Sequence, residues 1–174
     1  MTPTLFPQES ERVPFAIISP CGAYRYVLWR CWDPDLPCVV FIMLNPSNAD
    51  AETDDPTIRR CRSFAQSWGF GSIRIVNLYA YRSPNPRDLV PLSQAVRTGP
   101  LNDSYIKRVC AMDNAMIVAA WGAHQIAVSR VADVSMLIGN RPIYCLGENK
   151  NGTPKHPLYC RSGLSPQLLR GSYE

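Results

Sequence analysis

The fold class is first indicated by the stretch VVFIMLNPSNADAETDD, residues 39–55. It begins with an apolar run, residues 39–44, that contains no charge, glycine or proline and stops abruptly at Asn45. Such a run is typical of a strand buried on both faces, and strands of that kind belong mainly to parallel sheets. Polar and acidic residues follow, and in open α/β sheets ligands bind beyond the carboxyl ends of the strands. We therefore predict an active-site loop over residues 45–55.

Length and composition indicate one α/β domain over residues 1–174, with loosely ordered ends at 1–13 and 161–174. The net charge of +4 is mild. It permits contact with a polyanion but does not require it. Arginine greatly outnumbers lysine, which suits bidentate phosphate contacts. A GC-rich coding sequence would produce the same excess, so both explanations stay open.

The seven cysteines are odd in number and include no Cys-x-x-Cys pair. Several lie in apolar runs, where a thiol packs as a small hydrophobic group. The first residues lack the apolar core of a signal peptide, and no apolar run is long enough to span a bilayer. We expect a reduced, cytoplasmic, monomeric protein without a membrane contact or a cofactor. The cysteine spacing does not support an iron–sulfur cluster.

The rest of the chain alternates strand, loop and helix, which predicts about four parallel strands. An antiparallel β-hairpin with a turn at residues 20–22 precedes them. Asp54 or Asp55, followed by Pro56, marks the start of a helix. The expected strands are 39–44, 73–78, 115–120 and 142–146, and the expected helices are 56–68, 104–112 and 123–137.

Every predicted strand is followed by polar groups, which should meet at one edge of the sheet: Asn45, Asn77, residues 121–124 and residues 155–156. The two histidines both follow strands. His156 is the stronger catalytic candidate because its loop has no apolar periodicity, whereas His124 could equally be a helix cap. The spacing supports neither a metal site nor a Cys–His pair, and the glycine-rich nucleotide motifs are absent.

Four carboxylates follow the first buried strand: Asp50, Glu52, Asp54 and Asp55. Helix capping accounts for Asp54 or Asp55, and solvation could account for the others. A carboxylate near a strand end could also orient a water molecule or act as a base. Asp50 is therefore the functional candidate among the four.

Four segments together resemble the motifs of the uracil-DNA glycosylase superfamily, in the same order, across residues 39–159. LNPS at residues 44–47 resembles the first motif, in the Asn-Pro form of the mismatch-specific uracil/thymine branch. Asn77 in IVNLYAYRSPNP resembles the asparagine that reads the base edge. VAAWGAH at residues 118–124 and KHPL at residues 155–158 resemble the Trp-Gly strand end and the His-Pro-Ser motif. The whole chain is also similar to a family of bacterial and phage proteins without an assigned function.

The resemblance implies a three-layer α/β/α fold: a central, mostly parallel four-stranded sheet plus the hairpin. It also implies a DNA glycosylase that flips a modified or damaged base and cleaves its N-glycosidic bond, in repair or phage defence. In such an enzyme His156 stabilises the departing base, Asn77 binds its edge, and Asn45 holds water with help from Asp50. The remaining implied residues are Pro46, Ser47, Tyr79, Trp121 and His124 around the base, and Arg82, Lys150, Lys155, Leu158 and Tyr159 on DNA.

Three departures leave the substrate and the activity open. Asn45 cannot act as a general base, Leu158 replaces the serine of the His-Pro-Ser motif, and the cysteines of the iron–sulfur branch are not matched. The alternatives are a protein that binds a base or nucleotide without cleaving it, and a different nucleotide or DNA-modification enzyme on the same fold.

Overall fold

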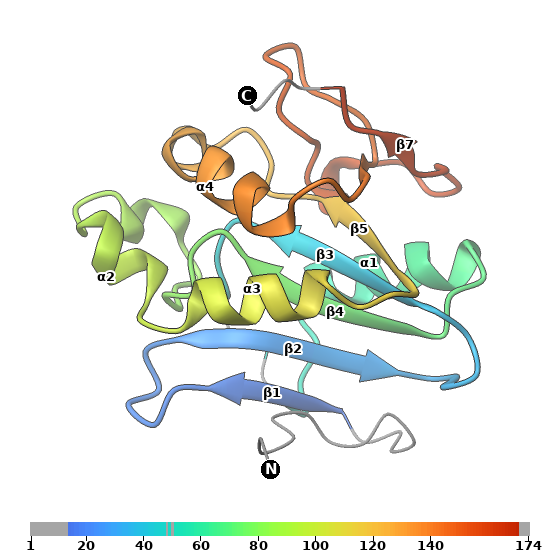
Figure 1. Cartoon of the computed structure of the whole chain (residues 1–174), viewed down its shortest axis with the longest axis horizontal. Coiled ribbons are helices and arrows are strands. Elements are labelled where there is room, and N and C mark those ends of the chain that lie inside the picture. The colour runs from blue at the N-terminus through green and yellow to red at the C-terminus, as the bar shows by residue number, and fades with distance from the viewer. Residues whose placement is uncertain (1–13, 48, 50, 171–174) are drawn as a thin grey trace.

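The computed structural model describes residues 14–170 except 48 and 50. The described residues form one seven-stranded sheet in the order β1-β2-β4-β3-β5-β6-β7 (Figure 1). The strands are β1 (Phe15–Ile18), β2 (Arg25–Cys31), β3 (Cys38–Met43), β4 (Ser72–Asn77), β5 (Ala115–Ala119), β6 (Ile143–Cys145) and β7 (Gln167–Leu168). The α-helices are α1 (Pro56–Ser67), α2 (Gln94–Thr98), α3 (Asn102–Cys110) and α4 (Val128–Ile138), and the 3₁₀ helices are η1 (Pro86–Leu89), η2 (Gln125–Ala127) and η3 (Pro157–Tyr159).

The predicted α/β class is confirmed, but the sheet is wider than expected. Strands β4, β3, β5 and β6 are parallel neighbours. The hairpin extends the sheet because β2 pairs antiparallel with β4. At the opposite edge β7 pairs antiparallel with β6. The sheet therefore has antiparallel strands at both edges. The hairpin at one edge was expected, and β7 at the other was not.

The C-terminal segment contains a strand that the sequence did not predict. Residues 161–170 are described, and they contain β7. Helix α1 anchors the preceding residues: Arg60 donates to the carbonyl oxygen of Cys160 and to Ser162 Oγ, and Trp68 Nε1 donates to the carbonyl oxygen of Leu164. The expectation for residues 1–13 lies outside the described residues.

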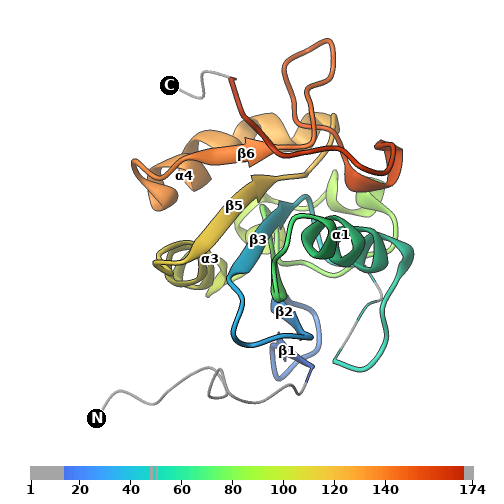
Figure 2. The ribbon, with the colours of Figure 1, turned by 90° about the vertical axis from the view of Figure 1, so that its right-hand side faces the viewer.

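Helices cover both faces of the sheet, which explains the apolar run in β3. Helix α1 packs on one face, while α3 and α4 pack on the other (Figure 2). Side chains of a strand alternate between the two faces. Val40 and Ile42 accordingly join the core under α3 and α4, and Val39 and Phe41 join the core under α1.

The connection after β4 is the segment that the sequence predicted least well. Residues 82–93 were expected to be a long proline-rich loop, and they include η1. The short helix α2 that follows was not predicted. Among the described residues no helix is long and apolar enough to cross a membrane.

Candidate functional site

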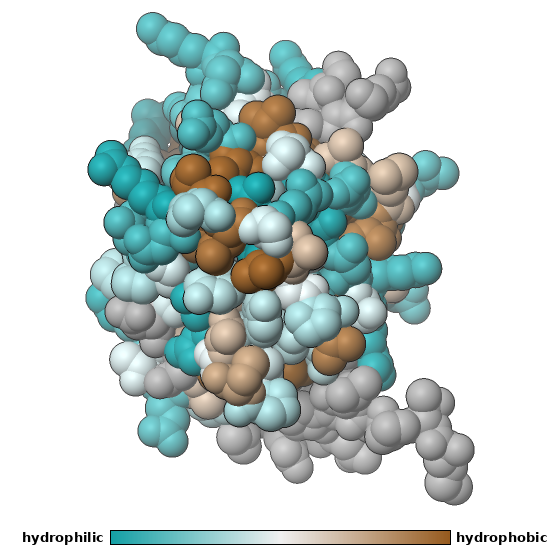
Figure 3. All heavy atoms as spheres, turned by 90° about the vertical axis from the view of Figure 1, so that its left-hand side faces the viewer, coloured by the Kyte–Doolittle hydropathy of each residue, from teal (hydrophilic) through white to brown (hydrophobic). Residues whose placement is uncertain are grey.

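A cavity of about 500 Å³ opens at the carboxyl ends of β3, β4 and β5. The face onto which these strand ends point is shown in Figure 3, where hydrophobic side chains gather among hydrophilic ones. Four separate segments that the sequence predicted to converge all contribute to the cavity wall. Its polar lining side chains are Arg25, Asn45, Ser47, Asp55, Thr57, Asn77, Ser83, Trp121, His124 and His156.

Asn77, the last residue of β4, is the most unusual group in this wall. It is 1% exposed, and neither Oδ1 nor Nδ2 has a hydrogen-bond partner among the described residues. Buried side-chain amides are normally satisfied, because an unpaired polar group costs about 1–3 kcal/mol. The parallel register places Asn77 opposite Met43, the last residue of β3. An unpaired amide at this edge is therefore available to a ligand in the cavity.

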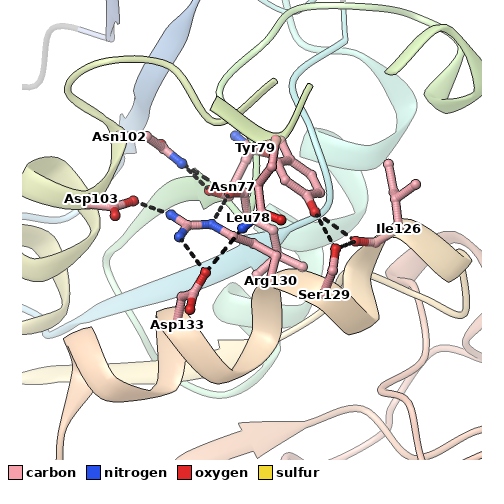
Figure 4. A network of polar contacts seen from close by, with 10 residues as sticks. Asn77, Leu78, Tyr79, Asn102, Asp103, Ile126, Ser129, Arg130 and Asp133 are labelled. Atoms are coloured by element: carbon pink, nitrogen blue, oxygen red, sulfur yellow. Dashed lines mark hydrogen bonds and ion pairs between the residues drawn. The ribbon is translucent and has the colours of Figure 1, made fainter. Parts of the chain in front are cut away.

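The backbone that carries Asn77 is held from behind by a polar network (Figure 4). Asn102 Nδ2 donates to the carbonyl oxygens of Asn77 and Leu78, at 3.0 and 3.1 Å. Arg130 Nε also donates to the carbonyl oxygen of Leu78, at 3.1 Å, and the guanidinium pairs with Asp103 and Asp133. These bonds act on the main chain and leave the Asn77 amide unpaired.

Tyr79 does not reach the cavity, which corrects its predicted place beside the base. Its side chain is fully buried in the core under α4, and its hydroxyl donates to the carbonyl oxygen of Ile126 at 2.7 Å (Figure 4). The Arg97 guanidinium lies over the ring, 5.1 Å from its centroid. Tyr79 is therefore a core residue that ties the segment after β4 to η2.

The Asn45 amide is oriented by two carbonyl groups. Nδ2 donates to the carbonyl oxygens of Pro46 and Ser83, at 3.1 and 2.9 Å. Because the nitrogen must face these acceptors, the amide orientation is determined. Oδ1 then has no donor among the described residues and can accept a hydrogen bond from a water molecule. Pro46 itself does not line the cavity and contributes through its backbone.

Both histidines line the cavity and have the same local geometry. His156 caps η3 and His124 caps η2, and in each case Nδ1 accepts from the backbone N–H two residues later, at 3.3 and 3.4 Å. A ring that accepts at Nδ1 carries its proton on Nε2 when neutral. Burial lowers the pKa of His156, and the nearby Asp55 charge opposes that shift. His156 thus favours the neutral form, with one N–H to donate.

Gly122 allows the loop after β5 to pass close to His156. Its φ of +79° is a conformation that favours glycine. A Cβ atom at this position would lie 3.4 Å from the Cβ atom of His156. Trp121, the preceding residue, is buried and lines the cavity.

Asp55 has two roles, of which the sequence predicted one. Its side chain caps α1, because Oδ1 accepts from the backbone N–H of Ile58 at 2.9 Å. Its other oxygen, Oδ2, accepts from Ser47 Oγ at 2.7 Å, and both residues line the cavity. Helix α1 directly follows the loop at the carboxyl ends of the strands, so its first residues lie at that edge. The predicted capping position of Asp55 could therefore have indicated that its side chain lies at the site.

Other acidic residues of the same loop are less informative. Asp54 pairs with Arg30 at 2.7 Å and does not line the cavity. Asp50, the predicted catalytic acid, lies outside the described residues.

Arg25 was missed by the sequence prediction. It is 2% exposed, lines the cavity, and donates from Nη1 to the carbonyl oxygen of Ala49 at 2.6 Å. It reaches the site because β2 runs antiparallel to β4, which brings the start of β2 to the edge where β4 ends. No local sequence pattern indicates that pairing.

The predicted DNA-contacting residues divide into two groups. Leu158 and Tyr159 line the cavity mouth and are 44% and 85% exposed. Lys150 and Lys155 are exposed but do not line the cavity. Arg82 also lies outside it, and its guanidinium donates to the carbonyl oxygen of Gly22 in the β1–β2 turn at 3.2 Å.

The described residues offer no group of three or more His, Cys, Asp or Glu side chains that could hold a metal ion. All seven cysteines are unbridged. Burial raises the pKa of the Cys61 thiol, and it raises that of Cys110 to about 12. Cys160 Sγ lies 3.5 Å from the carbonyl oxygen of His156, and burial raises its pKa too. These thiols therefore favour the protonated form, which is a poor nucleophile.

Comparison with known proteins gives a family but no relative of assigned activity. No curated protein matches the chain, and no solved structure matches it. One family model matches residues 25–158, a stretch that extends from β2 into η3 and includes every cavity-lining residue named above except Tyr159. The chain therefore belongs to the family described as "Protein of unknown function (DUF1643)".

Proposed function

We propose that this protein is a DNA glycosylase-like hydrolase that cleaves the N-glycosidic bond of a flipped, modified or damaged base. The observation that carries the proposal is the buried, unpaired amide of Asn77 in a cavity that two histidines also line. The cavity volume of about 500 Å³ lies in the range of small-molecule sites.

The Asn77 amide offers one acceptor and one donor side by side. A nucleobase edge with an adjacent donor and acceptor is the natural complement, because both bonds can form at once. An amide left unpaired in the unliganded protein regains its hydrogen bonds when such an edge binds. The free-energy cost of burying Asn77 is then offset on binding.

His156 provides the leaving-group stabilisation. When the glycosidic bond breaks, its electron pair leaves with the base, so negative charge develops on the base. A neutral imidazole N–H can donate to that charge inside a cavity of low dielectric constant, where such bonds are strong. Asn45 Oδ1 can hold the attacking water, and the amide cannot take its proton.

The motif order also supports the proposal. The segments that contain Asn45, Asn77, Trp121 and His156 resemble the superfamily motifs in sequence and line one cavity. We assign the chain the corresponding three-layer fold, with β4-β3-β5-β6 as its central strands. Leu158 and Tyr159 at the cavity mouth would fill the space of the flipped base, and Lys150 and Lys155 would contact phosphates.

A panel of DNAs with different modified bases, including phage DNAs, tests the proposal, with released bases detected by mass spectrometry. Wild-type protein should release a free base from at least one DNA. His156→Ala should slow this release about 10²-fold or more, because it removes the donor to the departing base. Tyr144→Phe, a conservative change in β6 outside this cavity, is the matched control and should leave release unchanged. Absence of release from every DNA would refute a glycosylase.

The second candidate is a protein that binds a base or nucleotide without cleaving it. It is favoured by one observation: the polar residue just beyond the end of β3 is Asn45, which cannot be a general base. Such a protein should bind its ligand equally well after His156→Ala and release nothing. Binding that is insensitive to salt would argue against DNA as the ligand.

A further inference from the structure

We infer that Ser47 and Asp55 form a proton relay that takes over the general-base role that Asn45 cannot perform. The inference rests on the proposed glycosidic hydrolysis and adds a residue pair to it. Ser47 contacts the attacking water, and Asp55 acts through Ser47.

The first support is the direction of the Ser47–Asp55 hydrogen bond. Asp55 Oδ1 accepts from the backbone N–H of Ile58, and Oδ2 lies 2.7 Å from Ser47 Oγ. An ionised carboxylate has no hydrogen to donate, so the Ser47 hydroxyl donates to Asp55. No described residue donates to Ser47 Oγ, so both of its lone pairs can accept, and Ser47 lines the cavity.

The second support is the position of the pair beside Asn45. Asn45 and Ser47 are two residues apart and both line the cavity. A water molecule can donate one hydrogen to Asn45 Oδ1 and the other to Ser47 Oγ. Asn45 would orient this water, and Ser47 would receive its proton.

The reaction then balances as follows. The water oxygen forms a bond to the anomeric carbon of the sugar, and the bond from that carbon to the base breaks with its electron pair leaving on the base. The water proton passes to Ser47 Oγ, and the Ser47 proton passes to Asp55 Oδ2. A water bonded to a cationic, oxocarbenium-like sugar is strongly acidic, so a weakly basic carboxylate is sufficient.

The charge of Asp55 also suits this position. It is the one carboxylate among the cavity-lining residues that the structure describes, and its negative charge favours the positive sugar of the transition state. The titratable groups on which its charge acts are His156 from η3 and Cys61 from its own helix, and Arg25 from β2 lines the same cavity.

A second serine–aspartate pair shows why the hydrogen bond alone would not suffice. Ser83 Oγ lies 2.5 Å from Asp88 Oδ2, but it also accepts from the backbone N–H of Asn85 at 3.1 Å. Asp88 does not line the cavity. That pair has a structural role in its turn, whereas Ser47 has unused acceptors and a carboxylate partner at the cavity.

The test uses Asp55→Asn, Ser47→Ala and the double variant on the DNA that wild type cleaves fastest. Each single variant should lower kcat about 10²-fold with little change in KM. The double variant should be no slower than either single one, because the two residues act as a unit. Asp113→Asn, which removes an exposed carboxylate near the opposite ends of the strands, should change nothing.

Folding does not confound this test, because asparagine caps a helix about as well as aspartate and Ser47→Ala leaves the bond from Ile58 intact. Wild-type release with unchanged kcat in both single variants would overturn the relay alone. Additive losses in the double variant would overturn it as well, since they indicate independent roles. Absence of release by wild type would overturn the proposed function and the relay together.

Discussion

The two ends of the parallel strands both open into cavities, but the described polar side chains that line them are used differently. The cavity at the amino ends is the larger, at about 700 Å³, against about 500 Å³ at the carboxyl ends. Its lining includes Trp29, Arg74, Arg141 and Tyr144. Volume alone would therefore select the amino-end cavity as the functional site.

The hydrogen bonds point to the other cavity. Arg141 at the amino end donates to the carbonyl oxygens of Cys110, Met112 and Ala115. Its guanidinium therefore satisfies main-chain acceptors. Asn77 at the carboxyl end has a buried amide with no partner among the described residues. A buried polar group without a hydrogen bond destabilises a folded protein, and such a group is expected where a bound ligand supplies the missing hydrogen bond. The unpaired Asn77 amide is therefore a better indication of the functional site than cavity volume.

The largest expected effect concerns Asn77→Leu, which exchanges the unpaired amide for an apolar group of similar shape. Base release should fall at least about 10²-fold, because a polar base edge would then meet no partner. The free energy of unfolding should rise by about 1 kcal/mol, since a buried unpaired group is removed. Chemical denaturation and the release assay measure the two effects.

Asn102→Leu is the matched control for Asn77→Leu. It should lower stability, because its amide donates to the carbonyl oxygens of Asn77 and Leu78. If Asn77→Leu destabilised the fold as much as Asn102→Leu, the Asn77 amide would have a structural role, and the contrast between the two cavities would fail.

The next effect concerns the amino-end cavity. Arg141→Met should lower the free energy of unfolding by about 2 kcal/mol, because three carbonyl groups lose a charged donor. It should leave base release unchanged below the unfolding temperature. A loss of release in folded Arg141→Met protein would mean that the amino-end cavity takes part in function.

The smallest expected effect is a pH dependence of stability. Burial lowers the pKa of His156 below its ordinary value of 6.5. The unfolded chain therefore binds this proton more tightly than the folded one. The contribution of neutral His156 to the free energy of unfolding is fully present above pH 6.5, and it is lost as the pH falls through the lower, folded-state pKa.

Denaturation of wild type and His156→Gln between pH 4.5 and 7.5 measures this contribution (roughly the range over which a histidine titrates). The variant should have a flatter profile than wild type in the acidic part of that range. Arg141→Met should keep the wild-type slope, because this substitution leaves His156 in place. Parallel profiles for wild type and His156→Gln would show that the His156 imidazole is not desolvated.

The α/β class and most of the convergent edge could be predicted from the amino-acid sequence alone. The apolar run of β3 indicated a strand covered on both faces, and α1 and α3 with α4 cover it. Parallel strands share an edge at their carboxyl ends, so polar residues after each strand must meet there. Asn45, Asn77 and His156 line one cavity for that reason.

Which of the polar groups at this edge have hydrogen-bond partners depends on the packing of the whole chain. Tyr79 is turned into the core by a bond to Ile126, 47 positions further along the chain. Arg25 enters the site through antiparallel pairing of β2, and β7 extends the sheet from a segment without a strand signal. Hydrogen-bond partners and strand neighbours that are distant in sequence leave no local pattern. The unpaired amide of Asn77 therefore became visible only after the surrounding residues had been placed.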